Sequence, residues 1–112
     1  MNVTENMLNN ISHIILEGRF DSDTSAIVEK IIREKIEKGV YRFILDMEKV
    51  LFVASAGLRV ILVIAKDLRQ HHGDLYIASL QTNVRRVFEI SGLDNALHIF
   101  EDAEAAARNF DE

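Results

Sequence analysis

The sequence predicts an α/β fold in which a mixed sheet of about five strands packs against about four helices. Segments rich in β-branched and apolar residues alternate with segments of helical periodicity. One of them contains the triplet Phe43-Ile44-Leu45, which is typical of a strand buried on both faces. Two extended segments separated by Asn9-Asn10 open the chain as a hairpin. Because the later strands each follow a helix, right-handed crossovers make the rest of the sheet parallel.

Length and composition predict one domain over residues 1–112. The chain contains no proline, and no repeat or low-complexity run marks a linker. The hydrophobic share of 48% and the charged share of 28% are typical of a folded globular chain. A core of this size is expected to suffice without disulfides or a structural metal.

The first half of the chain contains a hairpin, a helix and a strand. Strands are expected at residues 2–7 and 11–17, and a further strand at 41–47. Between them, Asp21-Ser22-Asp23-Thr24 offers helix caps and Gly39 can end the helix in the left-handed conformation. The apolar face of this helix is expected to comprise Ile27, Val28, Ile31, Ile32 and Ile36.

The second half continues the alternation. The apolar run 50–53 leads into a helix that extends from about Ala56 or Gly57 to about His72, with a core stripe at Leu58, Ile61, Leu62, Ala65 and Leu68. A strand follows at 75–80. Thr82 is expected to cap a helix at 83–91, whose inner face is Val84, Val87 and Phe88. A short strand at 97–100 and a helix with the stripe Ala103, Ala106, Ala107 and Phe110 complete the order.

Several classes of function lack the residues that they need. The absence of cysteine excludes disulfides, zinc-thiolate sites, iron–sulfur clusters and thiol nucleophiles. The five glycines are isolated, so no glycine-rich phosphate loop is predicted. The adjacent pair His71-His72 is poorly arranged for chelating one metal, and His13 and His98 have no nucleophile and orienting acid nearby in sequence. We therefore expect no catalysis, no cofactor and no metal.

Charge and hydropathy also restrict the partners. A net charge of −5, with the basic residues dispersed, argues against nucleic acid as a ligand. The longest apolar stretch, residues 60–65, is far shorter than the roughly 18 residues of a membrane span. Residues 1–10 do not resemble a signal peptide. The chain is expected to be cytoplasmic and not to insert into a membrane.

Two carboxylates lie where open α/β sheets bind ligands. Asp21 and Asp46 each follow an apolar strand, at its expected carboxyl end. Helix capping by Asp21 and turn formation by Asp46 are the simpler interpretations.

Ser55 lies between the apolar run 50–53 and the helix that follows. The simple interpretation is an N-cap whose hydroxyl accepts a hydrogen bond from a first-turn N–H. The functional interpretation is that Ser55 is a phosphorylation site, because a helix N-terminus accommodates a phosphate. The small residues Ala54, Ala56 and Gly57 would let another protein approach the hydroxyl closely. Both interpretations remain open on the residues alone.

The helix after Ser55 is apolar nearly all round in its first turns. Val60, Val63 and Ile64 lie opposite the core stripe. We expect Ile64 to be covered by a neighbouring helix and Val60 to be exposed to a partner.

Four segments, in order along the chain, resemble the STAS domain family. Phe52-Val53-Ala54-Ser55-Ala56-Gly57-Leu58 resembles its signature, in which a Phe- or Tyr-led turn reaches Asp-Ser-Ser/Thr-Gly-Leu before an apolar helix. Leu16-Glu17-Gly18-Arg19-Phe20-Asp21 resembles the end of its second strand. Leu45-Asp46-Met47-Glu48-Lys49-Val50 resembles the stretch before the signature, and residues 84–93 resemble its third helix with the closing Gly-Leu.

The resemblance implies an anti-sigma factor antagonist that works by partner switching. In this family the unphosphorylated antagonist binds an anti-sigma factor that is a serine kinase, phosphorylation releases it, and a PP2C-type phosphatase reverses the step. Carried onto this chain, the phosphoacceptor is Ser55, and the protein is expected to be a monomer or a weak dimer. The partner-binding surface would comprise Asp21, Ser22, Asp23, Ala54, Ser55, Ala56, Gly57, Arg59, Val60 and Val63.

Two positions depart from the family pattern. Ala54 replaces the acidic residue before the serine, and Ala56 replaces the Ser or Thr after it. These departures leave a second hypothesis, in which the chain is a STAS subunit that docks on an ATPase or permease of a membrane transport assembly without being phosphorylated.

Overall fold

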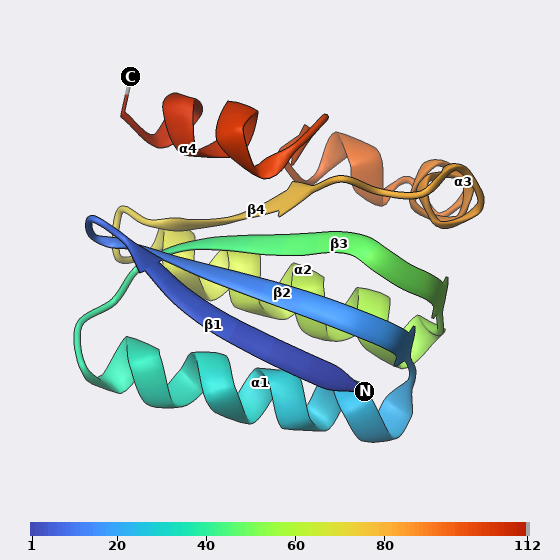
Figure 1. Ribbon diagram of the computed structural model, residues 1–112, viewed down its shortest axis with the longest axis horizontal. Helices are drawn as coiled ribbons and strands as arrows, with labels where there is room; N and C mark the ends of the chain where they lie inside the picture. The colour runs from blue at the N-terminus through green and yellow to red at the C-terminus, as the bar shows by residue number, and fades with distance from the viewer. Residues whose placement is uncertain (112) are drawn as a thin grey trace.

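The computed structural model describes residues 1–111 and contains a five-stranded sheet in the order β1-β2-β3-β4-β5 (Figure 1). β1 pairs antiparallel with β2, and the other neighbours pair parallel, so the predicted mixed α/β fold is confirmed. In chain order the elements are β1 (Asn2–Leu8), β2 (Ile11–Phe20), α1 (Ser22–Glu37), β3 (Arg42–Val53), α2 (Ser55–Arg69), β4 (Asp74–Ala78), α3 (Thr82–Ile90), a 3₁₀ turn (Leu93–Asn95), β5 (Ile99–Phe100) and α4 (Ala103–Phe110).

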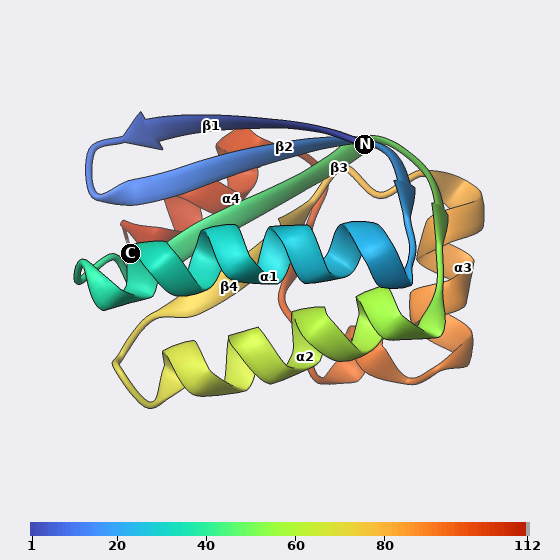
Figure 2. The same ribbon diagram turned by 90° about the horizontal axis from the view of Figure 1, so that it is seen from below.

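The helices cover the two faces of the sheet unequally. α1 and α2 lie side by side on one face, and α4 lies on the other (Figures 1 and 2). The larger core forms under α1 and α2, with Phe20, Phe43, Leu45, Ile61 and Leu68 fully buried. Under α4 a smaller apolar cluster comprises Ile11, Ile44, Ala78, Ala106 and Phe110.

Helix ends follow the predicted signals in part. Gly39 and Gly92 adopt positive φ values of 88° and 78° after α1 and α3, as their sequence positions predict. The prediction that Thr82 caps α3 is wrong, because Gln81 is the N-cap and Thr82 is the first helical residue. α2 ends at Arg69, and so His71-His72 lies in the turn beyond it.

The prediction that two further apolar residues lie in the core is wrong. Ile27 of α1 is 55% exposed and Val87 of α3 is 36% exposed. Both lie at the edge of the buried face of their helix, beside Val28 and Phe88. Ile64 is fully buried, as expected.

β3 is one long strand that replaces the predicted strand at 41–47 and the separate run at 50–53. Its pairing with β2 shifts register between Ile15 and Glu17 and again between Gly18 and Arg19. Asp46 therefore lies inside the strand, and the prediction that it ends a strand in a turn is wrong. Its carboxylate accepts a hydrogen bond from the Glu48 N–H and lies 3.1 Å from Nε2 of His13 on β2.

No helix within residues 1–111 combines the length and the apolar run that a membrane-spanning helix requires.

Candidate docking site

Ser55 is the first residue of α2 and its side chain is exposed. The interpretation of Ser55 as the N-cap is wrong, because Ala54 holds that position and supplies no side-chain cap. Among residues 1–111 no hydrogen bond engages the Ser55 hydroxyl. The N–H groups of Gly57 and Leu58 donate to the Ala54 carbonyl oxygen, whereas no side chain caps those of Ser55 and Ala56. The hydroxyl and the positive end of the helix dipole thus lie together on the surface.

The start of α2 is fixed against the end of β2. The backbone N–H of Ala54 donates to the carbonyl oxygen of Phe20 at 3.0 Å, and Phe20 pairs with Val53 in the sheet. Gly57 lies so close that a Cβ there would be 2.5 Å from the Phe20 ring and 2.9 Å from its carbonyl oxygen. These contacts hold Ser55 beside the turn that enters α1.

That turn is stabilised by Asp21, as the capping interpretation predicted. The Asp21 carboxylate accepts hydrogen bonds from the backbone N–H groups of Asp23 and Thr24, both at 3.1 Å. In return the Thr24 hydroxyl accepts from the Asp21 N–H at 2.8 Å, which completes a capping box. The two helix N-termini therefore lie side by side, and both N-caps follow neighbouring parallel strands.

The predicted surface residues separate into exposed and buried groups. Ser22, Asp23, Ser55 and Arg59 are exposed, whereas Asp21, Ala54 and Ala56 are half-buried and Gly57 is buried. The prediction that Val60 is exposed is wrong. Only 9% of Val60 is exposed, compared with 37% of Val63. Val60 still lines a small depression of about 50 Å³ together with Arg59, Val63 and Glu29 of α1.

Three further apolar residues are exposed although the sequence did not predict it. Leu51 and Phe52, near the end of β3, are 65% and 39% exposed, and Ile90 at the end of α3 is 80% exposed. The Asn83 side chain donates to the carbonyl oxygen of Leu51 at 3.0 Å and so ties α3 to this strand end. Arg19 lies over the Phe52 ring at 4.1 Å. Ile90 does not belong to the apolar face of α3 formed by Val84, Val87 and Phe88. This position along the helix is the signal in the sequence that indicates its exposure.

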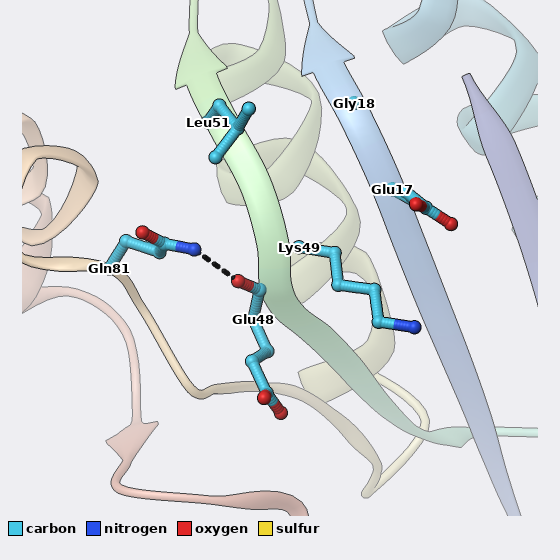
Figure 3. Close-up of a pocket in the computed structure, with 6 residues that line it drawn as sticks. All are labelled: Glu17, Gly18, Glu48, Lys49, Leu51 and Gln81. Atoms are coloured by element: carbon cyan, nitrogen blue, oxygen red, sulfur yellow. Dashed lines mark hydrogen bonds between the residues drawn. The ribbon is translucent and has the colours of Figure 1, made fainter.

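The larger cavity opens beside Leu51 and has a volume of about 500 Å³. Glu17 and Gly18 of β2, Glu48 and Lys49 of β3, and Gln81 also line it (Figure 3). Gln81 donates through its side-chain amide to the Glu48 carbonyl oxygen, which closes one side. Within residues 1–111 no cluster of His, Asp and Glu side chains has the arrangement of a metal site.

Asp21 gives a pH-dependent prediction. The backbone N–H of Thr24 stabilises the ionised carboxyl and holds the pKa of Asp21 below its ordinary value of 3.8. A lowered folded-state pKa adds stability that is complete above the unfolded-state pKa and is lost as the pH falls through the folded-state pKa. We expect Asp21→Ala to lower the urea midpoint at neutral pH, and the difference from wild type to shrink progressively below pH 3.8.

The control for this measurement is Glu34→Ala, which removes the same charge from an exposed position of α1 without removing a cap. A difference between Asp21→Ala and wild type that stays constant down to acid pH would contradict the role of the ionised cap.

Comparisons with known proteins agree with this geometry. The STAS domain family model matches residues 5–106. A candidate anti-sigma factor antagonist of Bordetella bronchiseptica, BtrV, is 36% identical over 110 residues, which cover 98% of this chain and 95% of BtrV.

Solved structures show the same fold at lower identity. The structure of a candidate anti-sigma factor antagonist of Thermotoga maritima matches with a TM-score of 0.93 at 18% identity, covering 98% of this chain and 95% of that one. The Bacillus protein SpoIIAA, solved in its phosphorylated form, matches with a TM-score of 0.75 at 23% identity, covering 96% and 98%. With its mixed five-stranded sheet, its serine at the start of α2 and these relatives, the chain belongs to the STAS domain family, in the branch whose members are named anti-sigma factor antagonists.

Proposed function

We propose that this chain is an anti-sigma factor antagonist that binds an anti-sigma serine kinase while Ser55 is unmodified. Phosphorylation of Ser55 by that kinase releases the chain, and a PP2C-type phosphatase restores binding. In this role the chain contributes a docking surface and a phosphoacceptor and carries out no catalytic step itself. Such partners act in the cytoplasm, where the sequence led us to expect the protein.

The observation that carries the proposal is the exposed Ser55 hydroxyl at an uncapped helix N-terminus. A kinase can reach this hydroxyl, and after transfer the phosphate oxygens lie next to the N–H groups of Ser55 and Ala56, which no side chain caps. Arg59, exposed one turn further along α2, adds a cation on the same helix. The phosphorylated chain is therefore expected to keep its fold, so the modification changes binding and not structure.

The surroundings of Ser55 explain why a phosphate would break a complex. Ala54 and Ala56 have small, half-buried side chains, so a partner can approach the Ser55 backbone closely here. A phosphate adds about −1.5 to −2 charges and the bulk of three oxygens at that point. A partner that fits the unmodified serine would have to bury this added charge, which costs several kcal/mol, on the order of 3–5.

The relatives support the same role. BtrV is named as an anti-sigma factor antagonist, and SpoIIAA is known in a phosphorylated form. BtrV is 36% identical to this chain over 95% of its own length and is named as an antagonist. This observation favours antagonism over docking on a transport assembly.

Ala54 and Ala56 restrict how the kinase recognises the serine. Ser55 has alanine on both sides in the sequence, so neither neighbour can orient its hydroxyl. The partner kinase must therefore supply the base and the orienting contacts.

The test is phosphate transfer from labelled ATP by the anti-sigma serine kinase encoded in the same genome. We expect wild type to be labelled and Ser55→Ala to remain unlabelled, because the hydroxyl that accepts the phosphate is then absent. The matched control is Ser91→Ala, which removes an exposed serine at the end of α3 and is expected to be labelled like wild type. Equal labelling of Ser55→Ala and wild type would overturn the assignment.

A further inference from the structure

Arg59 is exposed near the start of α2, and among residues 1–111 its guanidinium forms no ion pair. Glu29 of α1 lines the same small depression, but its carboxylate pairs with Arg33 at 3.5 Å. Arg33 also pairs with Asp67 of α2 at 2.7 Å, so these three side chains satisfy one another without Arg59. The unmodified chain therefore leaves the charge of Arg59 unmatched.

Arg59 follows Ser55 by four residues, so the two residues lie on the same face of α2, one turn apart. Side chains of a helix lean toward its N-terminus, and a long side chain covers the turn before its own Cα. The guanidinium of Arg59 can therefore reach back over the turn that contains Ser55. The three residues between them, Ala56, Gly57 and Leu58, are half-buried or buried, so no exposed side chain separates the two.

The charged groups on the neighbouring elements do not supply another cation for Ser55. Arg19, at the end of β2, lies over the Phe52 ring at 4.1 Å. Asp21 and Asp23, at the start of α1, are carboxylates, and Asp21 accepts backbone N–H groups of its own helix. Carboxylates repel a phosphate and do not bind it. Arg59 is therefore the cation that a phosphate on Ser55 would find free on its own helix.

The order of the two groups along α2 also suits an ion pair. On a helix, an anion that precedes a cation by four residues is the favourable orientation. A guanidinium presents its N–H donors in a planar fork that fits two oxygens of one phosphate. We propose that Arg59 is the counter-ion of the phosphate on Ser55 and binds it within the same chain. This inference rests on the phosphorylation of Ser55 in the proposed function.

The ion pair acts on the switch in two ways. It favours the dianionic phosphate over the monoanion, so the modified chain keeps its full added charge to lower pH. It also occupies Arg59, so phosphorylation removes a free cation from the docking surface when it adds an anion. A partner that returned to this surface would have to desolvate both charged groups, which keeps docking unfavourable although the charges are paired.

The test is the pKa of the phosphate, measured by phosphorus NMR on the full chain with phosphoserine incorporated at position 55 during translation. The second pKa of phosphoserine is ordinarily about 6. We expect Arg59→Gln to raise the phosphate pKa by about 0.3 pH unit or more, because the neutral amide no longer favours the dianion. Arg59→Lys keeps a cation at this position and is expected to restore part of the difference.

The matched control is Lys66→Gln, which removes the same charge from an exposed position in the last turn of α2. Lys66 lies roughly 16 Å further along the helix axis than Ser55, beyond the Debye length of about 8 Å. Its replacement is expected to leave the phosphate pKa unchanged. Arg19, Asp21 and Asp23 are present in every variant, so the difference between variants measures the contribution of Arg59.

Equal phosphate pKa values in the Arg59→Gln variant and the parent chain would overturn the inference, as would an equal rise in Lys66→Gln. Circular dichroism verifies that each variant is folded. Because the phosphoserine is incorporated without a kinase, the result is independent of the labelling experiment. A kinase that fails to label Ser55 would overturn the proposed function, whereas an unchanged phosphate pKa in a chain that the kinase does label would overturn only the role of Arg59.

Discussion

Replacing Ser55 by glutamate is expected to weaken binding to the anti-sigma kinase by about a hundredfold or more. The new carboxylate lies between the small residues Ala54 and Ala56, where a partner can approach closely, so a docked partner buries an unpaired charge. Losses of about 2–5 kcal/mol are usual for an unpaired charge in an interface, and about 1.4 kcal/mol corresponds to a tenfold change in affinity. Isothermal titration of the kinase with each variant gives the two dissociation constants.

The comparison requires a glutamate placed elsewhere on the surface. Ser91→Glu adds the same charge at the end of α3, where the serine is exposed. Its affinity is expected to equal that of wild type. An unchanged affinity of Ser55→Glu, with the kinase active and the variant folded, would count against a switch at this residue.

The largest loss of stability is expected from Gly73→Ala. Gly73 connects the end of α2 to β4, and its N–H donates to the carbonyl oxygen of Leu68 at 2.9 Å. A Cβ on Gly73 would overlap the carbonyl group of Tyr41, which itself accepts the N–H of Asp74 at 3.0 Å. Because the obstacle is backbone and not a flexible side chain, the turn must move. We expect a loss of about 3 kcal/mol or more in the free energy of unfolding.

Gly39→Ala is the matched control for this substitution. Gly39 has a positive φ of 88°, but a Cβ there would meet no other atom within 4 Å, so the cost is conformational and not steric. We expect a loss of about 1 kcal/mol at Gly39. Equal urea midpoints for the two variants would show that the clash at Tyr41 is relieved easily.

The order of elements could be predicted from the sequence because each strand and helix has its own local signal. The triplet Phe43-Ile44-Leu45 indicated a strand buried on both faces, and all three residues are fully buried. The length of β3 could not be predicted, because its second half depends on register shifts in the pairing with β2. Asp46 was therefore placed at a strand end, although it lies inside the strand beside His13.

The candidate site was predicted in its position but not in its details. Ser55 lies at the start of α2 as expected, but the cap position belongs to Ala54, since helix boundaries shift by a residue without a strong side-chain signal. The burial of Val60 depends on how closely α1 packs beside α2, which no pattern within α2 reveals. The exposure of Leu51 likewise results from tertiary packing.

The most direct measurement of the central claim uses one preparation of the native chain in two states. The chain is phosphorylated fully at Ser55 by its kinase, repurified, and titrated with that kinase before and after treatment with a PP2C-type phosphatase. We expect no measurable binding before treatment and the affinity of the unmodified chain afterwards. Equal affinities of the phosphorylated and dephosphorylated chain would contradict the account.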